Sequence, residues 1–138
     1  SVVFTDPEVP HFGLSGSGPR AFWGAPAVVA RHDYRDVDRA VTAATPYGFA
    51  KPVGDPRGRL VGATVAAPAA GEVIGELAAL VARDAGVGEV FKTVHPYPTF
   101  ALGAAMAGAA HLRQRLLTDR TRRVARPLLA GLRWVTRA

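Results

Sequence analysis

The sequence predicts an α+β fold in which helices cover an antiparallel sheet. Short apolar runs in the first half are separated by turns that contain Pro or Gly, as is typical of antiparallel strands. Residues 69–85 then repeat apolar residues at helical spacing, and an Ala-rich run begins near residue 100. The chain has 138 residues, which is enough for one domain with its own hydrophobic core.

The first strands are expected near the start of the chain. The apolar run that begins at Val2 predicts a strand, Asp6-Pro7 predicts a turn, and residues 9–14 predict a second extended piece. Residues 27–34 are rich in β-branched side chains and predict a further strand. The polar stretch 35–41 can hold one turn of helix.

The clearest local unit is a hairpin. Two apolar runs, 47–53 and 59–67, flank the sequence Gly54-Asp55-Pro56-Arg57-Gly58. Asp-Pro starts a turn, and Gly58 can close it. The two runs are therefore expected to pair as antiparallel strands.

Two helices are expected after the hairpin. The helix over 69–85 should place one apolar face on the hairpin, with Gly86 as its C-cap. A short connection over 86–93 leads to the second helix, about 100–117, for which Thr99 is a candidate N-cap.

Residues 93–99, which we call the strap, are the most constrained segment of the chain. Pro96 and Pro98 each fix their own φ and disfavour the α region for the preceding residue, so His95 and Tyr97 are expected to be extended. An imidazole and a phenol on a stiff loop just before a helix N-terminus predict a functional site.

The net charge of +6 comes from the end of the chain. Residues 113–138 hold eight arginines against Asp119, which gives +7, whereas residues 1–112 hold nine basic and ten acidic groups, which gives −1. We therefore expect a domain over 1–117 and a basic, amphipathic helical tail over 118–138.

The tail permits two interpretations. Its arginines at three-residue steps, with apolar residues between them, fit weak contact with an anionic membrane surface. The alternative is a solvated helix packed on its own protein. Nucleic-acid binding is not expected, because the aromatic residues are not interleaved with the basic ones. The arginines meant are Arg120, Arg123 and Arg126.

Several classes of site are not expected. Without cysteine there is no disulfide, thiolate nucleophile or Cys-based metal site. His11, His32 and His111 show no ligand spacing, so no metal site is predicted. No segment resembles a signal peptide, and no apolar run reaches the roughly 18 residues of a membrane span, so a cytoplasmic location is expected.

Three stretches in the same order carry a family resemblance. They are Val3-Phe-Thr-Asp-Pro-Glu-Val9 followed by Gly13-Leu14, then Gly58-Arg-Leu-Val-Gly-Ala63 with Gly71-Glu72 and Ile74-Gly-Glu76, and finally Thr93-Val-His-Pro-Tyr-Pro-Thr99. Together, over residues 2–117, they resemble the C-terminal dimerisation domain of the FAD-dependent pyridine nucleotide-disulfide oxidoreductases. That family includes dihydrolipoamide dehydrogenase, glutathione reductase and mercuric reductase.

The resemblance implies a piece of a longer chain that begins before Ser1. Other domains of that chain would hold FAD, NAD(P) and the redox-active cysteines, and these 138 residues would bind no cofactor themselves. The implied partners are a second copy of the chain and its own FAD and NAD domains. These 138 residues are expected to be part of an FAD-dependent oxidoreductase and to have no activity by themselves.

The resemblance also implies a role for the strap, which would reach into the partner subunit's active site. In disulfide reductases of the family a histidine precedes Pro-Thr and is held by a glutamate five residues later. Here those positions are Tyr97 and Leu102. Tyr97 and His95 are the catalytic candidates, and His95 and Pro96 are candidates for contact with the partner's FAD.

The residues leave alternatives open. A phenol with a pKa of ~10 is a poor base at pH 7, so the parent resembles dihydrolipoamide dehydrogenase in sequence but could be similar to mercuric reductase in chemistry. Tyr97 could instead be a plain interface residue, and His95 could simply bond a nearby carbonyl. Glu72 and Glu76 lie one turn apart, yet a helix N-terminus explains Glu72 without chemistry. A stand-alone interaction module that uses the basic tail is the remaining alternative.

Overall fold

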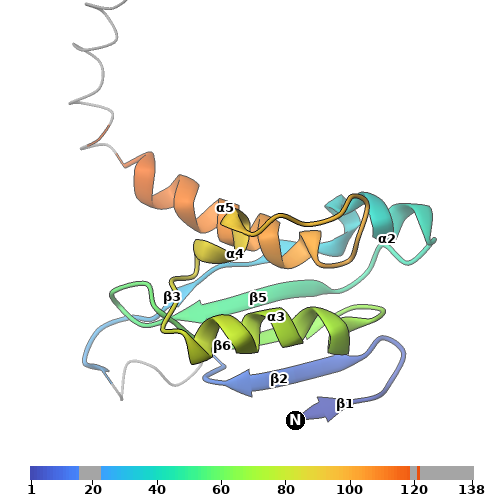
Figure 1. Cartoon of the computed structure of the whole chain (residues 1–138), viewed down its shortest axis with the longest axis horizontal. Helices are drawn as coiled ribbons and strands as arrows, with labels where there is room; N and C mark the ends of the chain where they lie inside the picture. Colours follow the sequence, from blue (N-terminus) through green and yellow to red (C-terminus); the bar gives the residue numbers. More distant parts are fainter. Residues whose placement is uncertain (16–22, 119–120, 122–138) are drawn as a thin grey trace, which may run out of the picture.

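The protein is an antiparallel sheet with helices packed on it (Figure 1). A computed structural model describes residues 1–15, 23–118 and 121. In this part of the chain six strands form one sheet in the order β1-β2-β6-β5-β3, and β4 also pairs with β5. All strand pairs are antiparallel. The strands are β1 (Val2–Val3), β2 (Val9–Gly13), β3 (Val28–Val29), β4 (His32–Asp33), β5 (Phe49–Gly54) and β6 (Leu60–Ala66).

The helices lie in a layer over this sheet. In Figure 1, α3 lies across β6 and β2, whereas α5 lies along β5 and β4 and is contacted by α4. The predicted α+β class, with helices covering an antiparallel sheet, is confirmed. The helical elements are η1 (Tyr34–Asp36), α2 (Asp38–Thr42), α3 (Ala70–Ala82), α4 (Glu89–Lys92) and α5 (Leu102–Leu116).

The predicted hairpin is formed by β5 and β6, with Phe49 opposite Ala66. Its turn is fixed by Asp55, whose Oδ1 accepts hydrogen bonds from the backbone N–H groups of Arg57 and Arg59, each at 2.9 Å. Asp55 Oδ2 also accepts from Arg59 Nε at 2.8 Å. Burial acts to raise the pKa of Asp55, but these hydrogen bonds and the charge of Arg59 lower it below its usual value.

Three elements differ from the sequence prediction. The strand expected over 27–34 is two short strands, β3 and β4. Helix α3 ends at Ala82 with Arg83 as its C-cap, so the C-cap predicted at Gly86 is wrong. Asp84 adopts the left-handed region at φ 52° and turns the chain there. The connection expected over 86–93 also contains a helix, α4.

The predicted cap of the last helix is also wrong. Helix α5 begins at Leu102, its N-cap is Ala101, and no side chain caps it. The hydroxyl of Thr99 instead donates to the carbonyl of Pro96 at 3.0 Å. That hydrogen bond closes the end of the strap rather than the start of the helix.

Small residues allow α5 to approach the rest of the domain closely. Tyr34 is fully buried, and its Oη donates to the carbonyl of Phe100 at 2.9 Å. A Cβ at Gly103 would lie 2.6 Å from Tyr34 Cζ, and one at Gly108 would lie 3.0 Å from the carbonyl oxygen of Val87. Burial raises the pKa of Tyr34 far above its usual value, so the phenol stays protonated.

The predicted tail lies almost wholly outside the described residues, since only Thr118 and Thr121 of 118–138 are described. The domain boundary at 117 and the contacts of Arg120, Arg123 and Arg126 therefore stay predictions. Within the part of the chain that the structure describes, no helix combines the length and apolar character needed to cross a membrane.

The close packing at Gly103 gives a stability prediction. Gly103→Ala should lower the free energy of unfolding by about 1–3 kcal/mol, because the new methyl group overlaps the Tyr34 ring. The matched control is Gly75→Ala in α3, where a Cβ meets nothing within 4 Å. That change should be neutral or stabilising by up to roughly 1 kcal/mol. Urea unfolding measures both, and equal effects would contradict the packing argument.

Candidate functional site

The imidazole of His95 in the strap contacts a carboxylate of helix α3. His95 Nε2 lies 2.9 Å from Oε2 and 3.1 Å from Oε1 of Glu76. The His95 side chain is only 7 % exposed, and that of Glu76 is 24 % exposed. The group that His95 Nε2 meets is thus a carboxylate from another element and not a backbone carbonyl.

The sequence analysis considered Glu76 only as a possible carboxylate pair with Glu72 and did not connect it with His95. Glu76 is one of the residues on α3 that follow Val73 at helical spacing, on the edge of the apolar stripe that includes the buried Leu77. A carboxylate on that edge can reach a group beside the helix without entering the core. This spacing was the available sequence signal for Glu76.

The phenol of Tyr97 in the strap is hydrogen-bonded to a carboxylate of α2. Tyr97 Oη donates a hydrogen bond to Oδ2 of Asp38, the first residue of α2. The hydrogen bond to Asp38 and the negative charge of that carboxylate raise the pKa of Tyr97 above its usual value. Tyr97 is therefore protonated at neutral pH and does not act as a base there. Asp38 was missed because it lies 59 residues from Tyr97 and leaves no local pattern.

The other predicted positions have different surroundings. Leu102 begins α5 and packs against the hydrophobic core. It supplies no carboxylate to the strap. Pro96 is exposed, in contrast to the buried ring of His95. The contact of Pro96 and His95 with a partner's FAD stays a prediction.

The strap and the helices beside it expose several apolar side chains. Val94 is 93 % exposed and Tyr97 is 72 % exposed. Phe91 in α4 is also exposed, as are small residues on the outer side of α3 such as Ala78 and Ala79. Several large apolar side chains exposed along one short segment, here Phe91, Val94 and Tyr97, are a feature of surfaces that protein partners cover.

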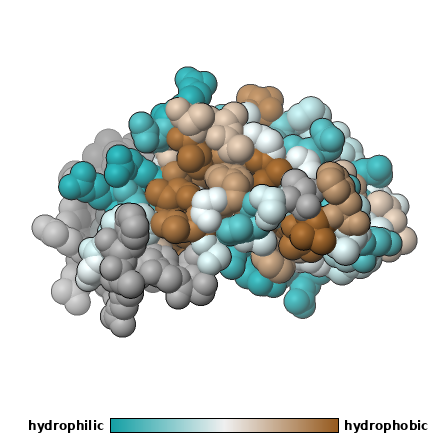
Figure 2. All heavy atoms as spheres, turned by 90° about the horizontal axis from the view of Figure 1, so that it is seen from below, coloured by the Kyte–Doolittle hydropathy of each residue, from teal (hydrophilic) through white to brown (hydrophobic). Residues whose placement is uncertain are grey.

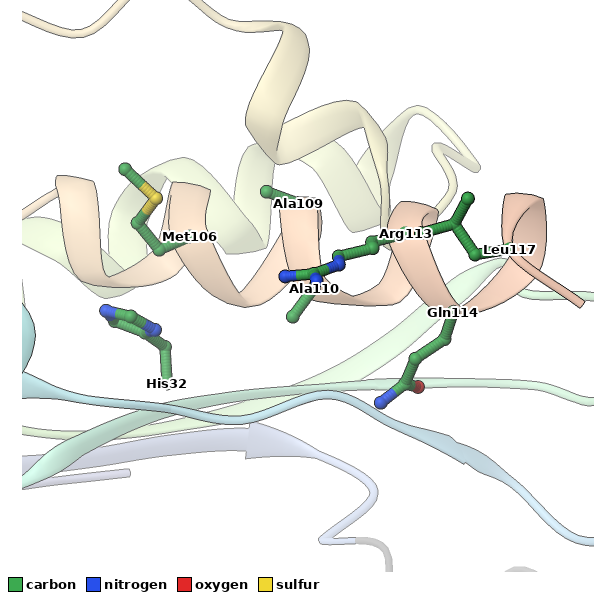
Figure 3. Close-up of a pocket in the computed structure, with 7 residues that line it drawn as sticks. All are labelled: His32, Met106, Ala109, Ala110, Arg113, Gln114 and Leu117. Carbon is green, nitrogen blue, oxygen red and sulfur yellow. The ribbon is translucent and has the colours of Figure 1, made fainter. Parts of the chain in front are cut away.

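A separate groove lies between β4 and α5. Figure 3 shows the ring of His32 beneath Met106, with the side chain of Arg113 extended along the helix. Its volume is about 580 Å³, and Nε2 of His32 has no hydrogen-bond partner in the described part of the chain. No strap residue lines this groove. The lining residues are His32, Met106, Ala109, Ala110, Arg113, Gln114 and Leu117.

The geometry of the described ranges provides no metal centre. No group of three or more His, Asp or Glu side chains there is arranged to hold a metal ion. The described strands are also all antiparallel and form no βαβ unit, so they build no Rossmann-type cradle for a dinucleotide.

Comparison with known proteins decides the family. Residues 1–107 match the profile of the pyridine nucleotide-disulphide oxidoreductase dimerisation domain. The chain belongs to this family. The resemblance found in the sequence is thereby confirmed, as is the prediction of a dimerisation domain.

Two dihydrolipoyl dehydrogenases are among the curated proteins to which this chain is similar. Dihydrolipoyl dehydrogenase 3 of Haloarcula marismortui is 31 % identical over 121 residues, which are 87 % of this chain and 25 % of that protein. Dihydrolipoyl dehydrogenase of Haloferax volcanii is 33 % identical over 86 % of this chain and 25 % of its own length. The chain spans about a quarter of these relatives.

Solved structures agree with the fold of this dimerisation domain. LpdA from Mycobacterium tuberculosis superimposes with a TM-score of 0.71 at 28 % identity. The match covers 86 % of this chain and 25 % of the LpdA chain. The HOCl-induced flavoprotein disulfide reductase RclA from Escherichia coli has a TM-score of 0.72 at 16 % identity, over 79 % of this chain and 25 % of its own. The second likeness concerns the fold alone.

The His95–Glu76 pair gives a prediction. Glu76→Ala should lower the free energy of unfolding by about 1–2 kcal/mol, because His95 then keeps a largely buried ring nitrogen without its acceptor. Glu72→Ala, one turn earlier on the exposed side of α3, should cost less than about 1 kcal/mol. Urea unfolding measures both, and hydrogen exchange at the strap amides should increase only in Glu76→Ala. A loss no larger than in Glu72→Ala would show that the pair does not anchor the strap.

Proposed function

We propose that this chain is the homodimerisation domain of a flavin-dependent NAD(P)H oxidoreductase similar to dihydrolipoamide dehydrogenase, and that its strap completes the active site of the partner subunit. The observation that carries the proposal is the strap itself. It is anchored within one subunit by Glu76 and Asp38, yet it leaves Val94 and Tyr97 largely exposed. A fixed backbone with exposed apolar and phenolic side chains suits insertion into a partner at low entropic cost.

We propose that a second copy of the chain covers the exposed side of the strap, where Val94 and Tyr97 lie. The family description supports self-association. The strap lies beside the outer side of α3, whose exposed Ala78 and Ala79 permit a close approach of a second backbone. A two-fold axis would then place each strap against the other subunit.

We assign FAD and NAD(P) to other domains of the same polypeptide, because the described residues build no dinucleotide cradle. Bound flavin would supply electron transfer from NAD(P)H.

Figure 2 shows apolar residues gathered in the middle of the face seen from below, the side on which β1 lies in Figure 1. Val3 of β1 and the following Phe4 are exposed. We propose that this face contacts the cofactor domains.

This chain's own contribution to the chemistry is a protonated phenol. Since the pKa of Tyr97 is raised, its phenol does not take a proton from a thiol at neutral pH. Tyr97 therefore favours, as a second candidate, a parent similar to mercuric reductase. Turnover of the flavin-containing parent with lipoamide and with Hg(II) separates the two candidates.

The homodimer gives a prediction with a matched pair of variants. Light scattering across a dilution series of the 138-residue chain should show a dimer. Val94→Asp should raise its dissociation constant at least about tenfold, because an unpaired charge enters a desolvated contact. Phe4→Asp, on the face assigned to the cofactor domains, should leave the dissociation constant unchanged.

Other outcomes would reject parts of this proposal. A strict monomer at high concentration would mean that the chain alone does not pair and would favour the stand-alone interaction module. Loss of the dimer in Phe4→Asp but not in Val94→Asp would move the interface to the β1 face.

A further inference from the structure

The hydrogen bond between Tyr97 and Asp38 joins the strap to a distant part of the same subunit. Tyr97 Oη is the donor and Asp38 Oδ2 is the acceptor, and both residues are exposed. The family position for a carboxylate, five residues after the ring, is occupied by Leu102, which packs against the core. A carboxylate partner for the Tyr97 ring must therefore come from another element. In this structure Asp38 of α2 is that partner.

The position of Asp38 beside the strap is fixed by packing on both sides. Val37 and Ala40, which flank it, are buried in the core. The guanidinium of Arg39 lies 5.6 Å from the centroid of the Phe100 ring. The carbonyl of Phe100 accepts the hydrogen bond from the buried Tyr34 at 2.9 Å. Helix α2 and the end of the strap are thus attached to the same part of the core.

The direction of this hydrogen bond decides what the phenol can offer a ligand. An ionised carboxylate only accepts hydrogen bonds, so the single proton of Tyr97 is directed to Asp38. The lone pairs of Tyr97 Oη are then left for an outside group. Tyr97 is 72 % exposed, so its ring lies at the surface of the subunit, where another molecule can approach it.

We propose that Asp38 is a positioning residue for Tyr97 and holds the phenol oxygen toward the partner subunit's site as a hydrogen-bond acceptor for a ligand that carries a donor group, such as a thiol. The proposal rests on the proposed function, because it requires that the strap reach that site. It adds a residue from α2 and assigns a direction to the hydrogen bond. A disulfide has no donor, so the pair should favour the dithiol form of a substrate.

The hydrogen bond is tested first in the 138-residue chain, with tyrosine labelled by ¹³C at Cζ and the Tyr97 resonance identified by its loss in Tyr97→Phe. Asp38→Asn should lower the pKa of Tyr97, because it removes the carboxylate charge that raises it. Asp38→Glu should keep most of the effect. Asp36→Asn, which removes an equal charge two residues away on the exposed turn, should leave the resonance and its pKa unchanged. Equal shifts in Asp38→Asn and Asp36→Asn would overturn the proposal.

The positioning role is tested in the flavin-containing dimer with dihydrolipoamide as the probe. Tyr97→Phe and Asp38→Asn should each lower kcat/KM by about threefold to tenfold, the effect of losing one hydrogen bond. The double variant should be no worse than Tyr97→Phe, because Asp38 acts through Tyr97. Asp38→Glu should recover most of the loss, and Asp36→Asn should match the wild type. With lipoamide as the probe, Asp38→Asn should have a smaller effect.

The outcomes separate this proposal from the one on which it rests. If Tyr97→Phe lowers kcat/KM but Asp38→Asn does not, or if the two losses are additive, the positioning role is overturned and the proposed function stands. If Tyr97→Phe has no effect on either probe, the strap does not act in the partner's site, and the proposed role of the strap fails together with that of Asp38.

Discussion

The close approach of α5 to η1 and to the segment before α4 is the constraint on which the rest of the structure depends. Gly103 lies against the Tyr34 ring and Gly108 against the backbone at Val87, and neither position has room for a side chain. Tyr34 in turn donates to the carbonyl of Phe100, at the junction of strap and helix. The depth of α5 in the domain therefore sets the end of the strap, and with it the position of Tyr97.

The strap then receives one carboxylate from α3 and one from α2. Glu76 of α3 meets His95, and Asp38 of α2 meets Tyr97. The two rings differ in exposure, because the imidazole is almost covered whereas the phenol is mostly accessible. The same backbone segment thus has one ring that serves its own subunit and one that is available to another molecule. Sequence reasoning treated both rings as site candidates, and only the structure separates them.

Most of the fold could be predicted because its signals are local. The hairpin follows from Asp55-Pro56 between two apolar runs, and α3 follows from apolar residues at helical spacing. Elements with weak local signals were missed or misplaced, such as the four-residue α4 and the left-handed turn at Asp84.

The strap could be found from its prolines, but its partners could not. Glu76 lies 19 residues from His95, and Asp38 lies 59 residues from Tyr97. Contacts over such separations depend on how helices pack on the sheet, which no motif in the chain specifies. The absence of a carboxylate at Leu102 was visible in the sequence, whereas its replacement by one from α2 was not.

These long separations tie assembly to folding. The strap can take its final shape only after α2 and α3 have both docked on the sheet, since its two anchors come from those helices. A subunit with either helix undocked has a strap without one of its carboxylates and presents a different surface. Pairing of two chains through the strap would thus select subunits that have finished folding, and the interface would act as a check on the integrity of each subunit.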